Sequence, residues 1–183
     1  MRAIDVRDLL ETPGSSRTVH VEEPVPGLRT ELADVPEDTP IAADLTLESV
    51  VEGIFVRGSL EGRFAMRCAR CLKTFERDFD VEMTELVPRD PGPDDDYALE
   101  PDLTLDPEPI VRDAVVLEMP FSPLCRPDCL GLCEICGGDR NLGECPGHEV
   151  TDPRWDALDV LLQHLEAQPD QEPSDDDDRT TTS

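Results

Sequence analysis

Two cysteines separated by two residues, Cys68 and Cys71, lie between two stretches in which apolar and polar residues alternate. The apolar positions are Leu60, Phe64 and Met66 before the pair and Phe75, Phe79, Val81 and Met83 after it. Alternation with a period of two is typical of half-buried β-strands. Two thiols at a tight turn can bind one tetrahedral ion at about 2.3 Å. The sequence therefore predicts a β-hairpin whose tip carries half of a zinc site.

A further strand is expected before the hairpin, over residues 44–56, with a bulge at Gly53 and a turn at Arg57-Gly58. Together the three strands form an antiparallel meander within residues 41–87, which is the smallest sheet that can keep one packed face. One face of the meander should be apolar, and the other should carry the arginines.

A core helix is expected within the segment 107–122. Asp106 can cap its start at Pro107, and Met119-Pro120 ends it. Its apolar stripe at helical spacing comprises Ile110, Val111, Ala114, Val115 and Leu117. We expect this helix to cover the apolar face of the meander, which makes the fold class α+β.

The remaining segments hold little material for a core. Residues 1–40 are expected to be irregular apart from an edge strand at 18–25, and residues 88–106 form an acidic, proline-rich linker. A terminal helix is expected over 151–167, where Trp155 is interpreted as a packing anchor against the metal module and not as a base-stacking platform. The linker and the acidic tail at 168–183 should be disordered or loosely held.

A second concentration of cysteines occupies residues 123–150. Five thiols and one histidine fall within 24 positions: Cys125, Cys129, Cys133, Cys136, Cys145 and His148. The glycine that follows Cys133-x-x-Cys136 has the position expected in a zinc knuckle, where the backbone must turn sharply. This segment is therefore predicted to be a zinc module.

Counting ligands favours two zinc sites of four ligands each. One site would comprise Cys133, Cys136, Cys145 and His148, and the other would join Cys68 and Cys71 to Cys125 and Cys129. The alternative is one four-cysteine site, made of Cys129, Cys133, Cys136 and Cys145, with the hairpin pair left without metal. Disulfides are the less favoured use of the seven cysteines, because their number is odd and no signal peptide or membrane span is apparent. A cytoplasmic protein is expected.

Closed four-ligand sites leave no position for a substrate, so the zinc would be structural and the protein would not be an enzyme or bind a small-molecule substrate. A thioredoxin-like redox role does not fit Cys68-x-x-Cys71, because such pairs begin a helix and this one joins two strands.

The net charge of −27 argues against a nucleic-acid partner, but its distribution is uneven. Residues 57–77 contain six bases and two acids, so this window carries +4. We interpret Arg63, Arg67, Arg70 and Lys73 as candidate contacts to RNA phosphate. Equally well, these bases could pair with the chain's own acids.

The ordered motifs resemble the YceD family of large ribosomal RNA subunit accumulation proteins. They are Met66-Arg67-Cys68-Ala69-Arg70-Cys71-Leu72, Glu118-Met119-Pro120-Phe121-Ser122-Pro123-Leu124-Cys125, Asp128-Cys129-x-Gly131-Leu132-Cys133-x-x-Cys136-Gly137 and Asp152-Pro153-Arg154-Trp155. The resemblance extends from about residue 40 to 166. Relatives commonly end the cluster with Cys-x-Cys, whereas this chain has Cys145-Pro-Gly-His148, which leaves the role of His148 open.

The resemblance implies a non-enzymatic role in the accumulation of 23S ribosomal RNA and in assembly of the large ribosomal subunit. The expected partner is ribosomal RNA or a large-subunit assembly intermediate, contacted through the basic hairpin. Two alternative hypotheses remain: the protein is an acidic adaptor for a basic ribosomal protein, or it is a zinc-dependent stress or redox sensor.

Overall fold

The computed structural model describes residues 1–148, 155, 158, 160–162 and 164 of the 183-residue chain. The chain divides into two units, Met1–Glu144 and Cys145–Ser183, and each is described by itself. The described residues 158, 160–162 and 164 of the second unit are helical. The predicted helix at 151–167 otherwise lies outside the described residues, as does the predicted tail at 168–183. No helix among the described residues is long and apolar enough to cross a membrane.

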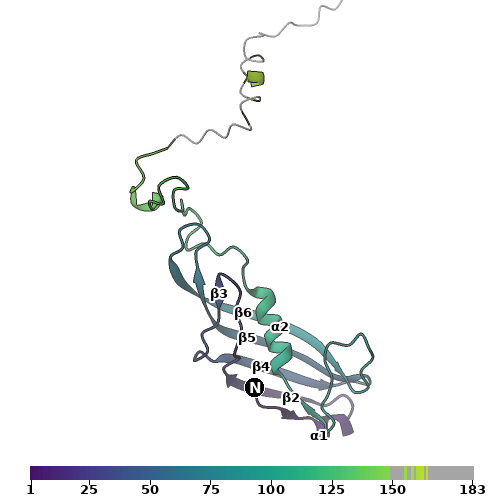
Figure 1. The fold of residues 1–183 in the computed structure, drawn as a ribbon. Helices are drawn as coiled ribbons and strands as arrows, with labels where there is room; N and C mark the ends of the chain where they lie inside the picture. The colour runs from purple at the N-terminus through teal and green to yellow at the C-terminus, as the bar shows by residue number, and fades with distance from the viewer. Residues whose placement is uncertain (149–154, 156–157, 159, 163, 165–183) are drawn as a thin grey trace, which may run out of the picture. The chain divides into compact units, whose positions relative to one another are not determined.

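The first unit is α+β, as predicted, and is built around one antiparallel sheet (Figure 1). Its elements in chain order are β1 (Ile4–Asp5), α1 (Arg7–Glu11), β2 (Ser16–Glu23), β3 (Ala33–Asp34), β4 (Ile41–Ser49), β5 (Gly53–Arg67), β6 (Thr74–Pro88), β7 (Thr104–Leu105), α2 (Glu108–Glu118) and the short 3-10 helix η1 (Arg140–Leu142). The strands β2, β4, β5 and β6 lie in that order, and β3 pairs with the end of β5. The strand expected at 18–25 corresponds to β2, at the edge beside β4.

The hairpin of β5 and β6 is the longest feature of the sheet. Each strand has 15 residues, and the pairing runs without interruption from Gly53 opposite Pro88 to Arg67 opposite Thr74. The alternation seen in the sequence gives the sheet one buried face. The side chains of Leu60, Phe64 and Met66 are buried there, and the ring of Phe64 stacks on that of Phe79 at 4.3 Å.

The turn before this hairpin is not where the sequence suggested. The chain turns at residues 50–52, where the Val50 amide donates to the Gly53 carbonyl at 3.0 Å, and Arg57-Gly58 lies inside β5. A Cβ atom at Gly58 would lie 2.3 Å from the Asp44 carbonyl oxygen of β4. Glycine at this position therefore permits close backbone approach within the sheet and does not form a turn.

The helix α2 covers the buried face of the sheet (Figure 1) and contributes Ile110, Val111 and Val115 to the core. Asp106 accepts a hydrogen bond from the Glu108 amide at 2.9 Å, so it supports the helix start as expected. Leu117 does not belong to the buried stripe, because 85% of it is exposed.

The segment at 88–106 is better held than the sequence indicated. Its last residues form β7, which pairs with β1, and Leu105 is buried. Tyr97 packs against the core and donates a hydrogen bond to Asp113 of α2 at 2.9 Å. These contacts fix parts of a stretch that composition alone predicts to be loose.

Candidate metal centres

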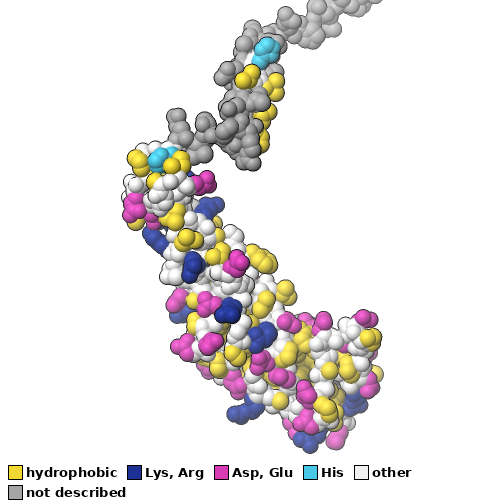
Figure 2. Space-filling view, viewed as in Figure 1, with side chains coloured by type: hydrophobic (Ala, Val, Ile, Leu, Met, Phe, Trp, Pro, Cys, Tyr) yellow, Lys and Arg dark blue, Asp and Glu magenta, His cyan; other side chains and the backbone are white. Residues whose placement is uncertain are grey.

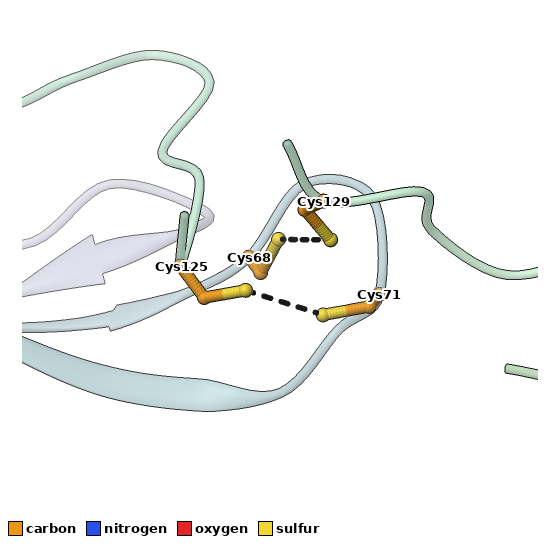
Figure 3. A group of neighbouring side chains, drawn as sticks. All are labelled: Cys68, Cys71, Cys125 and Cys129. Atoms are coloured by element: carbon orange, nitrogen blue, oxygen red, sulfur yellow. Dashed lines mark hydrogen bonds between the residues drawn. The ribbon is translucent and has the colours of Figure 1, made fainter. Parts of the chain in front are cut away.

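Four cysteine side chains converge at the tip of the long hairpin (Figure 3). Cys68 and Cys71 belong to the loop between β5 and β6, and Cys125 and Cys129 belong to the segment after α2. The sulfur atoms of Cys68 and Cys129 are 3.8 Å apart, and those of Cys71 and Cys125 are 3.7 Å apart. All four sulfur atoms lie within 4.8 Å of one another. This grouping is the one that the ligand count favours.

The spacing of these sulfur atoms suits a metal and does not suit disulfides. Four thiolates at about 2.3 Å from one tetrahedral ion are about 3.8 Å apart, whereas a disulfide requires about 2.05 Å. Accordingly, Cys68, Cys71, Cys125 and Cys129 form no disulfide in the structure. Because one protein chain supplies four sulfur atoms around one point, the coordination shell would be complete.

The turn that carries Cys68 and Cys71 has knuckle geometry. The amide of Leu72 donates to the Cys68 carbonyl at 2.9 Å, and the amide of Cys68 donates to the Lys73 carbonyl at 2.9 Å. Leu72 has a φ of 59°, in the left-handed region. The turn thus reverses the chain within six residues and directs both thiols to the same side.

The turn that carries Cys133 and Cys136 has the same pattern. The Gly137 amide donates to the Cys133 carbonyl at 2.8 Å, the Cys133 amide donates to the Gly138 carbonyl at 2.9 Å, and Gly137 has a φ of 71°. Leu72 therefore occupies the place that Gly137 has in the second turn. The sequence identified the second knuckle by this glycine, and it gave no such signal for the first.

The pKa values of two of the thiols, Cys68 and Cys125, are shifted in opposite directions. Burial raises the pKa of the Cys68 thiol, but hydrogen bonds from nearby backbone amides outweigh it and lower this pKa to about 6. Burial and the neighbouring thiols raise the pKa of Cys125 to about 12. A thiolate at Cys68 thus disfavours ionisation of Cys125, and a bound metal cation would offset this repulsion.

Backbone contacts attach the segment after α2 to the hairpin tip. The Ala69 amide donates to the Pro123 carbonyl at 2.8 Å, and the Leu132 amide donates to the Arg70 carbonyl at 3.0 Å. Gly131 has a φ of 75°, and a Cβ atom there would lie 2.9 Å from the Arg70 carbonyl oxygen. Glycine is needed at this contact for both its conformation and its size.

The other predicted set of ligands comprises Cys133, Cys136, Cys145 and His148. Cys133 and Cys136 belong to the first unit, and Cys145 and His148 belong to the second. The joint four-ligand site stays a prediction. Cys129 groups with the hairpin cysteines, which is not the arrangement of the single-site alternative.

The four bases proposed to contact RNA differ in their surroundings. Arg63 forms ion pairs with Asp78 at 2.6 Å and Glu76 at 3.5 Å. Arg70 donates to the Cys129 carbonyl at 2.8 Å, and Lys73 pairs with Asp139 at 2.7 Å. Arg67 is exposed and has no ion pair or side-chain hydrogen bond within the described part of the chain.

The Lys73–Asp139 pair was not foreseen from the sequence. Asp139 is only 6% exposed, and its pKa is lowered to about 2, chiefly by the Lys73 ammonium and then by Asn141. The residues are 66 positions apart, so no local pattern announces their contact.

Acidic residues outnumber the arginines on the outer face of the hairpin. The side chains that alternate with the buried ones include Arg57, Arg63 and Arg67, together with Glu61, Glu76, Asp78, Asp80 and Glu82. A groove of about 680 Å³ on this face is lined by the four acids Glu61, Glu76, Asp78 and Asp80, and also by Arg63, Pro36 and Pro40. On the opposite side of the first unit, which Figure 2 shows, acidic and basic side chains are intermingled.

Comparison with known proteins gives one family and several mycobacterial relatives. The model of the family described as large ribosomal RNA subunit accumulation protein YceD matches residues 56–162. Uncharacterized proteins of Mycobacterium tuberculosis and Mycobacterium bovis are each 36% identical over 168 residues, covering 87% of this chain and 80% of the relative. An uncharacterized protein of Mycobacterium leprae is 31% identical over 167 residues, covering 86% of this chain and 76% of the relative. No solved structure matches the chain.

Proposed function

Because this chain belongs to the YceD family of large ribosomal RNA subunit accumulation proteins, we propose that it acts in the bacterial cytoplasm as a non-enzymatic factor for accumulation of 23S ribosomal RNA and assembly of the large subunit. The family match over residues 56–162 carries the proposal, and it includes the hairpin and the group of four thiols. A complete shell of protein ligands supports a structural role for the metal, since no position is left for a substrate.

The metal is proposed to be zinc. Sulfur-only and mixed sulfur–nitrogen donor sets with four ligands are those that structural zinc prefers. One ion would bind Cys68, Cys71, Cys125 and Cys129, which we call the first centre. A second ion would bind Cys133, Cys136, Cys145 and His148.

Depletion of the protein in cells tests the proposed role. We expect a lower ratio of 23S to 16S ribosomal RNA and fewer free large subunits on a sucrose gradient, because large-subunit precursors would be degraded or stalled. Restoring the wild-type chain should restore the ratio. An unchanged ratio with the protein fully depleted would refute the proposal.

Contact with RNA is proposed to involve Arg63 and Arg67 on the outer face of the hairpin. The ion pairs of Arg63 are exposed and screened by solvent, so RNA phosphate could replace them. Arg70 and Lys73 have partners in the cysteine-rich segment, and their proposed role is to hold that segment.

Charge reversal at Arg63 and Arg67 tests the proposed contact with RNA. We expect Arg67→Glu with Arg63→Glu to weaken co-sedimentation with large-subunit precursors, with zinc content unchanged. Arg2→Glu, an exposed charge reversal away from the hairpin, is the matched control. Full co-sedimentation of the double variant would exclude the RNA contact proposed here.

The acidic groove supports a second candidate, an adaptor that binds a basic ribosomal protein. Its acids Glu61, Glu76, Asp78 and Asp80 could receive an extended segment rich in lysine and arginine. In that case Glu61→Lys with Asp80→Lys should abolish binding of a lysine-rich ribosomal protein in the absence of RNA. Salt-sensitive binding of naked RNA, with no binding of the basic protein, would favour the hairpin contact instead.

A further inference from the structure

Asn141, the single asparagine of the chain, lies beside the first centre without belonging to it. Its Nδ2 is 3.7 Å from the Sγ atom of Cys129, which is the distance of an N–H···S hydrogen bond. Cys129 is itself buried, with 1% exposed, so water does not compete for this contact. The side chain of Asn141 comes from η1, twelve residues after the cysteine.

The orientation of this amide is fixed by its other partners. Its Oδ1 accepts hydrogen bonds from the Leu130 amide at 2.8 Å and from Arg126 at 2.7 Å, and both groups can only donate. Its Nδ2 donates to the Asp139 carboxylate at 2.8 Å. A flipped amide would place oxygen against carboxylate and nitrogen against two donors. The nitrogen must therefore face the sulfur atom.

Asp139 connects this amide to the hairpin tip. One of its oxygen atoms accepts from both the backbone and the side chain of Asn141, each at 2.8 Å, and the other lies 2.7 Å from the Lys73 ammonium. Lys73 follows Cys71 by two residues, so the network connects the Cys129 thiol to the hairpin turn that carries Cys71. Its members come from both segments that supply the four thiols.

We propose that Asn141 is a positioning residue of the first centre, which donates a hydrogen bond to the Cys129 thiolate and is held in place by Asp139 and Lys73. This inference rests on the metal centre proposed above. A hydrogen bond to a thiolate stabilises its negative charge, and partners of this kind orient metal ligands and raise metal affinity. The loop at 138–144 thus contributes to the first centre although it supplies none of its four ligands.

The test uses the zinc-loaded full-length chain and a competing chelator. At each chelator concentration, alkylation followed by mass spectrometry reports which cysteines have become accessible. For Asn141→Asp, we expect the peptide with Cys125 and Cys129 to be exposed at a chelator concentration about 10- to 100-fold lower than in the wild type. The carboxylate removes the donor and adds repulsion with both the thiolate and Asp139.

Asn141→Ala removes the donor without adding charge, and it decides the outcome if Asn141→Asp does not fold by circular dichroism. Arg140→Ala is the matched control, because this neighbouring side chain is exposed. This variant should leave the midpoint, which is the chelator concentration that exposes half of the Cys125 and Cys129 peptide, within about twofold of the wild-type value. A midpoint for Asn141→Ala within twofold of the wild type would overturn the proposal. Alkylation of wild-type Cys125 and Cys129 at the same rate with and without zinc would instead refute the metal centre itself.

The absorption spectrum of the cobalt-loaded chain provides a second measurement. It should not change if Asn141 only supports the fold of its loop. Loss of a hydrogen bond to sulfur raises the energy of the thiolate electrons, so the sulfur-to-cobalt charge-transfer band should shift to lower energy in Asn141→Ala at saturating cobalt. An unchanged band would also contradict the proposal.

Discussion

Leu72 has a left-handed backbone, a conformation in which a side chain other than that of glycine costs about 1–2 kcal/mol. The knuckle needs this conformation because the amide of Leu72 must reach the Cys68 carbonyl. The side chain is 54% exposed and contributes little to the core. The four-thiol group therefore tolerates a strained residue that its turn geometry imposes.

Substitutions at Leu72 should separate conformation from packing. Leu72→Gly relieves the left-handed strain but makes the unfolded chain more flexible, so we expect a gain of about 0–1 kcal/mol in the free energy of unfolding. Leu72→Val should lose about 1 kcal/mol or more, because a β-branched residue is least tolerated there. Denaturant titration of the zinc-loaded variants measures both, and equal stability of the two variants would contradict the strain argument.

The Lys73–Asp139 pair should matter mainly through its buried partner. Lys73→Met would leave the Asp139 carboxylate without its cation, and we expect a loss of about 1–3 kcal/mol. Adding Asp139→Asn in the same chain should recover most of this loss, since the amide carries no charge to compensate. Denaturant titrations of the single and double variants provide the check. A double variant less stable than Lys73→Met alone would show that the charge is not the cause.

Among the elements, the β5–β6 hairpin was the most predictable, because one face of each strand is buried and the alternation is regular. The start of β5 was not predictable. Arg57-Gly58 resembles a turn in sequence, whereas the actual turn at 50–52 contains two valines, which are typical of strands. Pairing of β7 with β1 links residues about 100 positions apart, and nothing local in the sequence indicates such a pair.

Gly58 provides a test at the scale of this strand. Gly58→Ala would place a Cβ atom 2.3 Å from the Asp44 carbonyl oxygen and 2.9 Å from Leu45, so β4 and β5 must move apart. We expect a loss of about 1–3 kcal/mol in the free energy of unfolding. Ser59→Ala, at the next position of the same strand, should change it by less than about 0.5 kcal/mol. If Gly58→Ala proved as mild as Ser59→Ala, close strand contact would not explain this glycine.

In the first unit as a whole, the four thiols of the first centre connect the hairpin tip to the segment after α2, next to the main core. The sheet and α2 share one hydrophobic cluster, while Cys68, Cys71 and Cys129 form another. The ligand count anticipated this connection from the sequence. The roles of Arg70 and Lys73 could not be anticipated, because their partners lie 59 and 66 residues away and a basic window has the same appearance whether it binds RNA or the chain itself.

Removal of the metal should therefore loosen one end of the first unit and leave the sheet intact. Hydrogen exchange measured after chelation should become faster at residues 67–74 and 123–144, since these segments depend on the first centre. The amides of β4 and of the middle of β5 should keep their protection. Uniform loss of protection over the sheet would mean that the metal supports the entire core.

Zinc content per chain tests the central claim most directly, because the first centre is assigned to four particular cysteines. We predict that Cys125→Ser with Cys129→Ser removes one zinc ion per chain relative to the wild type, measured by elemental analysis of the purified full-length protein. Cys68→Ser with Cys71→Ser should remove the same single ion, and combining all four changes should remove no more. An unchanged zinc content in either double variant, or a larger loss in the fourfold variant, would contradict a shared site at the hairpin tip.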